Sequence, residues 1–153
     1  MNEKQLEIRK LVNDFVEYSM RFISLAALEG FKDEKNKMLG EFVIRFKNMF
    51  NDFRTERDIQ SFYKSYQEAT KGEKRALIEF LGYTKDKRFV PFLLDIARSG
   101  SFYSIDSIIS LGQMGDLEAI KDLEEILETA DNEVLQNVIK SVVYTIKKKN
   151  GIV

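Results

Sequence analysis

Apolar residues recur along this chain at intervals of three and four positions, the pattern of helices that bury one face. The first such stretch runs from about Glu3 to Glu29, where Gly30 would end it, and the second follows Asp33 and ends near Phe53. Because the connection between them is short, we expect these two helices to form an antiparallel hairpin. Long alternations of polar and apolar residues, the mark of strands, are missing. The pattern therefore predicts an all-α protein.

A third helix is expected to begin near Thr55, where Thr55 and Asp58 form a variant of the capping box, and to end at Lys71-Gly72. Five shorter helices are expected over residues 73–84, 87–98, 102–113, 117–129 and 133–149. Eight of the twelve Phe precede residue 71, whereas later apolar positions are mostly Leu, Ile and Val. We therefore expect a Phe-rich N-terminal helical cap over residues 1–70, packed as one unit with a helical array over residues 71–153.

The second half of the chain matches itself at an offset of 30 residues. The matching pairs are Ile78/Ile108, Leu81/Leu111, Gly82/Gly112, Asp86/Asp116, Val90/Ile120, Leu93/Leu123 and Ile96/Ile126. Each unit would hold two helices, with the aspartate as the N-cap of the second helix. The helix over 133–149 would then be half a repeat. Such units cannot bury their apolar faces alone, so a stacked array of about two and a half repeats is expected.

The first repeat contains Leu81-Gly82, Asp86 and the run Val90-Pro91-Phe92-Leu93-Leu94. The second contains Leu111-Gly112, Gly115-Asp116 and Ile120-Lys121-Asp122-Leu123, without the proline. This pattern resembles HEAT-like repeats, in particular the short bacterial type named after phycobilisome lyases. The resemblance covers about half of the chain and implies an α-solenoid. It does not select a function, because members of the family bind proteins, nucleic acids or modified substrates.

The chain has no Cys, His or Trp. Without Cys there are no disulfides, thiolate zinc sites or thiol nucleophiles, and without His the usual general base and commonest metal ligand are missing. We therefore predict no enzymatic activity, no cofactor and no metal site. No apolar run is long enough to span a membrane, and the N-terminus lacks the layout of a signal peptide. A cytoplasmic location without membrane contact is the expectation.

Charge is distributed unevenly along the second half. Residues 101–133 contain nine acidic side chains and one Lys, whereas residues 71–100 contain seven basic and four acidic side chains. Glu118, Asp122 and Glu125 share one helix face by their spacing. Two interpretations stay open. The face is either solvated, with its acids placed favourably near a helix N-terminus, or it docks a protein with a basic surface.

Two phenylalanines are candidate apolar anchors. Phe92 aligns with Asp122 in the sister repeat and Phe89 aligns with Ala119. Together with Glu118, Asp122 and Glu125 they form the predicted partner-binding set, although both could instead pack into the core. The run Lys147-Lys148-Lys149 is interpreted as favourable placement of cations at a helix C-terminus.

These observations predict a non-enzymatic protein–protein interaction module that binds and masks or regulates a partner protein, as immunity and inhibitor proteins do. Two alternatives are a HEAT-like nucleic-acid-binding protein and a lyase-like enzyme subunit. An acidic helix face and a net charge of −1 disfavour nucleic acid, which requires a basic groove. The sequence defines neither the partner nor the oligomeric state.

Overall fold

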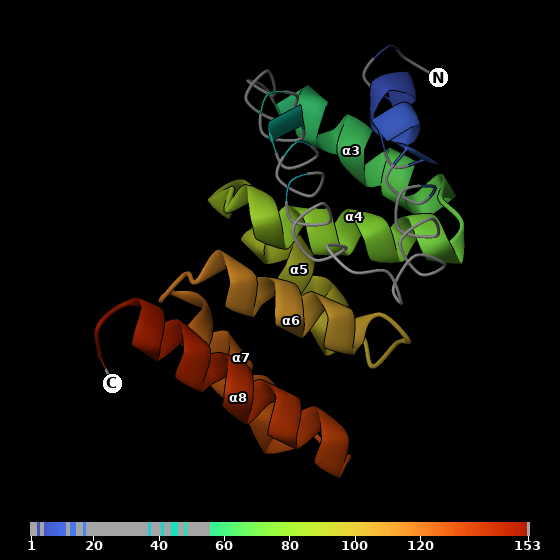
Figure 1. Cartoon of the computed structure of the whole chain (residues 1–153). Helices are drawn as coiled ribbons and strands as arrows, with labels where there is room; N and C mark the ends of the chain where they lie inside the picture. Colours follow the sequence, from blue (N-terminus) through green and yellow to red (C-terminus); the bar gives the residue numbers. More distant parts are fainter. Residues whose placement is uncertain are drawn as a thin grey trace, which may run out of the picture. The chain divides into compact units, whose positions relative to one another are not determined.

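The structure is a computed structural model that describes residues 56–152 and, before them, residues 3, 5–11, 13, 14, 17, 37, 41, 44, 45 and 48. Every described residue that lies in a regular element is helical, and the described part of the chain contains no strand. The all-α class predicted from apolar spacing is therefore confirmed for this part of the chain (Figure 1).

The chain forms two compact units, Met1–Leu77 and Ile78–Val153. Their junction lies inside helix α4 (Lys71–Thr84), so it is not a linker. The expected junction at residue 70 lies just before this helix. Helix α4 contributes its first half to one unit and its second half to the other.

In the first unit, α3 (Glu56–Glu68) buries Ile59 and Phe62. The described residues of the two expected N-terminal helices are helical, and Asp14 and Arg45 join them by an ion pair of 3.0 Å. Arg9 pairs with Glu68 of α3 at 3.4 Å. The expected helix end at Gly30, the cap at Asp33 and the capping box at Thr55 and Asp58 depend on residues or side chains outside the described part.

The prediction that Lys71-Gly72 ends the third helix is wrong, because α3 ends at Glu68 and Lys71 begins α4. Thr70 provides the start signal. Its hydroxyl oxygen accepts the Glu73 backbone N–H at 3.3 Å, and its hydroxyl lies 3.0 Å from the Glu73 carboxylate. This is the spacing of a capping box. Gly72 therefore lies in a first helical turn, where a glycine is tolerated, and does not terminate a helix.

The second unit continues from α4 through the 3-10 turn η1 (Lys87–Phe89), α5 (Val90–Arg98), α6 (Ser104–Met114), α7 (Ala119–Thr129) and α8 (Glu133–Lys149). Helix α5 packs against α6 and α7, and α8 packs against α6 and α7. The expected helix limits agree with these bounds to within three residues. Pro91 lies in the first turn of α5, where its missing N–H leaves no helical hydrogen bond unmade.

Part of the core of this unit consists of residues that match at the 30-residue offset, although Ile120, the match of the buried Val90, is only half-buried. Leu81 and Leu111 are both fully buried, and so are Leu93 and Leu123. The predicted burial of Leu93 and Leu123 is therefore confirmed. Ile96 and Ile126 are also buried.

Gly82 and Gly112 match at the 30-residue offset, and each faces a neighbouring helix. The two helix contacts differ in whether backbone or side-chain atoms face the glycine. A Cβ on Gly82 would lie 3.0 Å from the Cα of Ser110, so α4 and α6 approach backbone to backbone. The Ser110 hydroxyl adds a 2.6 Å hydrogen bond to the Ile78 carbonyl. A Cβ on Gly112 would instead lie 3.2 Å from Cγ1 of Val142. A side chain therefore separates α8 from α6, whereas nothing separates α6 from α4 at the equivalent place.

Candidate protein-binding surface

The two aspartates that match between the repeats form the same local structure. The Asp86 carboxylate accepts the Arg88 backbone N–H at 3.1 Å, and the Asp116 carboxylate accepts the Glu118 backbone N–H at 3.2 Å. Asp86 caps the 3-10 turn η1 and not α5 itself, and the prediction that Asp116 is an N-cap is wrong, because Glu118 is the N-cap of α7 and Asp116 holds the turn before it. The N-caps of α5 and α7 are Phe89 and Glu118, and neither makes a side-chain cap hydrogen bond. The two aspartates therefore order the turns that precede these helices.

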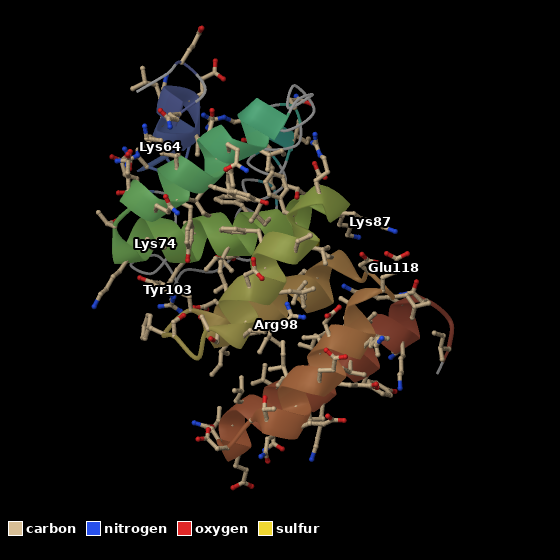
Figure 2. The ribbon with its side chains drawn as sticks, turned by 180° about the vertical axis from the view of Figure 1, so that it is seen from behind. Lys64, Lys74, Lys87, Arg98, Tyr103 and Glu118 are labelled. Atoms are coloured by element: carbon tan, nitrogen blue, oxygen red, sulfur yellow. The ribbon has the colours of Figure 1, made fainter. Side chains whose placement is uncertain are left out.

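The three predicted contact acids of α7 do not share one environment. Glu118 and Glu125 are exposed, whereas Asp122 is half-buried and accepts a 2.5 Å hydrogen bond from Arg98. Arg98 ends α5, so this pair joins the second helices of the two repeats. Figure 2 shows Lys87 and Glu118 near each other at the right edge of the view and Arg98 nearer the middle. The structure thus brings Glu118 and Glu125 to the surface and assigns Asp122 to an inter-helix contact.

A second ion pair joins the same two repeats. Lys87 lies 3.8 Å from the Asp116 carboxylate, which is itself buried. The Arg98–Asp122 pair has side-chain exposures of 43% and 35%, so it stabilises the fold by only ~0.2–1 kcal/mol. Sequence reasoning missed both pairs. The available signal was the step from a basic segment, 71–100, to an acidic one, 101–133.

The two phenylalanines differ in burial. Phe89 is fully buried, so it is removed from the predicted contact set. Its match in the sister repeat, Ala119, is also buried, which makes this a core position filled by side chains of different size. Phe92 is half-buried and stays a candidate for contact with a partner.

Three further acids in and just before α7 carry charge that no described residue neutralises. Glu118, Glu125 and Glu128 are exposed, and none forms an ion pair with another described residue. Arg88 and Arg98 of the first repeat already bind carboxylates of this protein. Arg88 binds the Asp86 carboxylate through Nε at 3.0 Å, and Arg98 binds Asp122. The α5–α7 surface therefore presents free carboxylates and paired guanidinium groups.

The lysine run at the C-terminus includes one structural residue. Lys149 Nζ donates hydrogen bonds to the Gly112 and Gln113 carbonyls at 2.9 and 3.2 Å, and Asn150 Nδ2 donates to the Gly115 carbonyl at 2.9 Å. These bonds satisfy carbonyls at the C-terminus of α6 that have no helical partner. Burial, with a smaller effect from the charge of Lys85, lowers the pKa of Lys149 below its usual value.

Sequence reasoning also missed a groove between α6 and α8. It has a volume of about 560 Å³ and a mostly apolar surface, with Ile109, Val134, Val138 and Val142 in its lining beside the polar Gln113, Asn137, Ser141, Thr145 and Lys149. Lys149 lies at its edge. The exposed apolar positions of both helices were visible in the sequence, but the distance between the helices was not.

Other kinds of site are not found in the described part of the chain. No group of three or more Asp or Glu side chains there is placed to hold a metal ion. None of the described helices combines the length and the apolar character needed to cross a membrane. No protein-family model, curated protein or solved structure matches this chain.

Proposed function

We propose that this protein is a HEAT-like α-solenoid protein that works by binding another protein and masking or regulating it, as immunity and inhibitor proteins do. Contacts between alternate helices support the repeat architecture, since α5 packs on α7 and α6 on α8. Lys85 and Gly115, which match at the 30-residue offset, also share the left-handed backbone conformation, with φ of 54° and 68°. Equivalent helix ends therefore have equivalent geometry.

The proposed partner has a basic surface and docks on the exposed face of α5 and α7. One observation carries this proposal: Glu118, Glu125 and Glu128 are exposed and make no ion pair in the described part of the chain. Unpaired carboxylates on one face attract a basic protein over about a Debye length, ~8 Å at physiological salt. Asp122 is removed from the contact set because Arg98 already neutralises it.

Charge reversal tests the acidic face once a partner has been isolated from the native host by affinity capture and mass spectrometry. The double variant Glu118→Lys/Glu125→Lys should slow association and flatten its dependence on salt, because steering is long-range and screened. The dissociation rate should change less. Surface plasmon resonance at two ionic strengths measures both rates.

A matched control separates the face from net charge. The variant Asp131→Lys/Glu133→Lys makes the same change in total charge at two exposed positions that both lie beyond the C-terminal end of α7. It should slow association less than the Glu118/Glu125 reversal. Equal association rates for the two variants would remove the acidic face from the mechanism.

Phe92 is expected to act through contact, not through steering. Phe92→Ala should raise the dissociation rate and leave the salt dependence of association unchanged. Phe102→Ala is the matched control, because Phe102 is an exposed aromatic residue in the turn before α6. A Phe92→Ala variant with the wild-type dissociation rate would exclude this residue from the interface.

A further inference from the structure

The groove between α6 and α8 has two chemically different ends. The C-terminal ends of the two helices meet where Lys149 binds the carbonyls of Gly112 and Gln113. Val134, in the first turn of α8, lines the opposite end. The groove is therefore apolar where the helices begin and cationic where they end, since Lys148 and Lys149 are both exposed there.

At the matching glycines, α8 meets α6 through a side chain, whereas α6 meets α4 through backbone atoms. Helix α6 has Ser104, Ser107 and Ser110 at its contacts, and all three are buried and donate hydrogen bonds to carbonyls of neighbouring helices. The positions 30 residues later in α8 are Val134, Asn137 and Lys140. Of the three serines only Ser110 bonds to α4, and at the α6–α8 contact the side chain of Val142 faces Gly112, so the backbones do not meet there.

Apolar side chains of both helices remain exposed along the groove. The exposed fractions are 48% for Ile109 and 61% for Val134, and Ile105 lies one turn before Ile109 on the same face of α6 with 37%. A small-molecule site normally buries ~70–90% of its ligand. An open groove with such exposed walls fits an amphipathic helix better, because a helix covers a shallow surface with a row of side chains.

We propose that this groove binds an amphipathic helix of a partner protein, with its apolar row on Ile109 and Val134 and with acidic residues of its first turn at Lys148. This inference rests on the proposed protein-binding function and assigns it a second surface. The direction follows from charge. The carbonyl ends of α6 and α8 lie at the lysines, so the positive N-terminal end of a docked helix is favoured there. Acidic side chains are also common in the first turn of a helix.

Selection from a library of helical peptides tests the proposal. Peptides of about five turns (~18 residues) are displayed, selected on the wild-type protein and counter-selected on Ile109→Asp. Enriched sequences should have apolar residues at i, i+3 or i+4, and i+7, and Asp or Glu in the first turn. Fluorescence anisotropy of the enriched peptides should show binding weakened about tenfold or more by Ile109→Asp.

Two further variants define the site. Lys148→Glu should weaken binding mainly at low salt, because Lys148 contributes charge at the groove end. Leu117→Asp is the matched control: Leu117 is 43% exposed, close to Ile109, but it does not line the groove. Binding to Leu117→Asp should stay within about twofold of wild type, because Leu117 lies outside the groove and a few central contact residues account for most of the affinity. Circular dichroism should show unchanged helicity for all three variants.

Several results would overturn the inference. One is a library without sequences that survive counter-selection, and another is a set of peptides that bind wild type and Ile109→Asp equally. A dimer in sedimentation equilibrium that Ile109→Asp converts to monomer would assign the groove to a second copy of this chain. A lipid that co-purifies with wild type but not with Ile109→Asp would assign it to a small amphiphile. The Glu118→Lys/Glu125→Lys variant should bind the peptides normally, so failure of the acidic face is distinguishable from failure of the groove.

Discussion

Replacing either of two equivalent glycines by alanine should have different effects on stability. A Cβ on Gly82 meets the Cα of Ser110 at 3.0 Å and its carbonyl oxygen at 3.1 Å. Backbone atoms cannot move without separating α4 from α6. A Cβ on Gly112 meets only the two methyl groups of Val142, at 3.2 and 3.3 Å, and these can shift by a small rotation.

The magnitude follows from three contributions. Overpacking at Gly82 costs ~1–3 kcal/mol, and loosening the Ser110–Ile78 hydrogen bond costs ~1 kcal/mol more. Alanine in place of glycine within a helix returns ~1 kcal/mol. Gly82→Ala should therefore lower the free energy of unfolding by ~1–3 kcal/mol. For Gly112→Ala the gain in helix propensity offsets a smaller clash, so the change should lie within ~1 kcal/mol of zero.

Urea unfolding followed by circular dichroism measures both variants against wild type. The midpoint should fall for Gly82→Ala at an unchanged slope, since only stability is altered. Gly112→Ala serves as the control, because it adds the same methyl group at the matching place in the next repeat. The reasoning about backbone contact is refuted if Gly82→Ala is as stable as wild type, or if Gly112→Ala is the more destabilised of the two.

Five other substitutions, at three kinds of position, have definite expected outcomes. Lys85→Gly should raise the free energy of unfolding by ~0.5–1 kcal/mol, because Lys85 has a φ of 54° that glycine adopts without a steric penalty; Gly115→Ala, at a φ of 68°, should lower it in the same urea assay. Truncation of fully buried Leu93 or Leu123 to Ala should each cost ~2–5 kcal/mol, and a melting temperature unchanged in both would contradict the repeat register. Burial lowers the folded-state pKa of Lys149 below 10.5, so charging this amine costs more free energy in the folded protein than in the unfolded chain. The stability that Lys149 contributes is therefore fully present above the unfolded pKa and is lost as the pH falls through the folded pKa. The stability difference between wild type and Lys149→Gln should therefore shift in favour of wild type as the pH rises toward 10.5, and a difference independent of pH would count against a desolvated ammonium group.

Local features of this protein could be inferred from its sequence because they depend on neighbours along the chain. Apolar spacing indicated the helical class, and the 30-residue self-match indicated that Leu93 and Leu123 occupy equivalent buried positions. Asp86 could be identified as a cap because an aspartate before a helix accepts backbone N–H groups from the residues that follow it. The error at Lys71-Gly72 arose from giving a glycine more weight than the capping pair Thr70 and Glu73.

Only the tertiary structure decided which side chains remain free to bind. The sequence grouped Asp122 with Glu118 and Glu125 by helical spacing, but Arg98 reaches it from a helix 24 residues earlier. Tertiary packing likewise places Lys149 on the carbonyl end of α6 and creates the groove between α6 and α8. Helical periodicity specifies the direction in which a side chain points and not the distance to the next helix. That distance depends on whether a backbone, as at Ser110, or a side chain, as at Val142, faces the glycine across the interface.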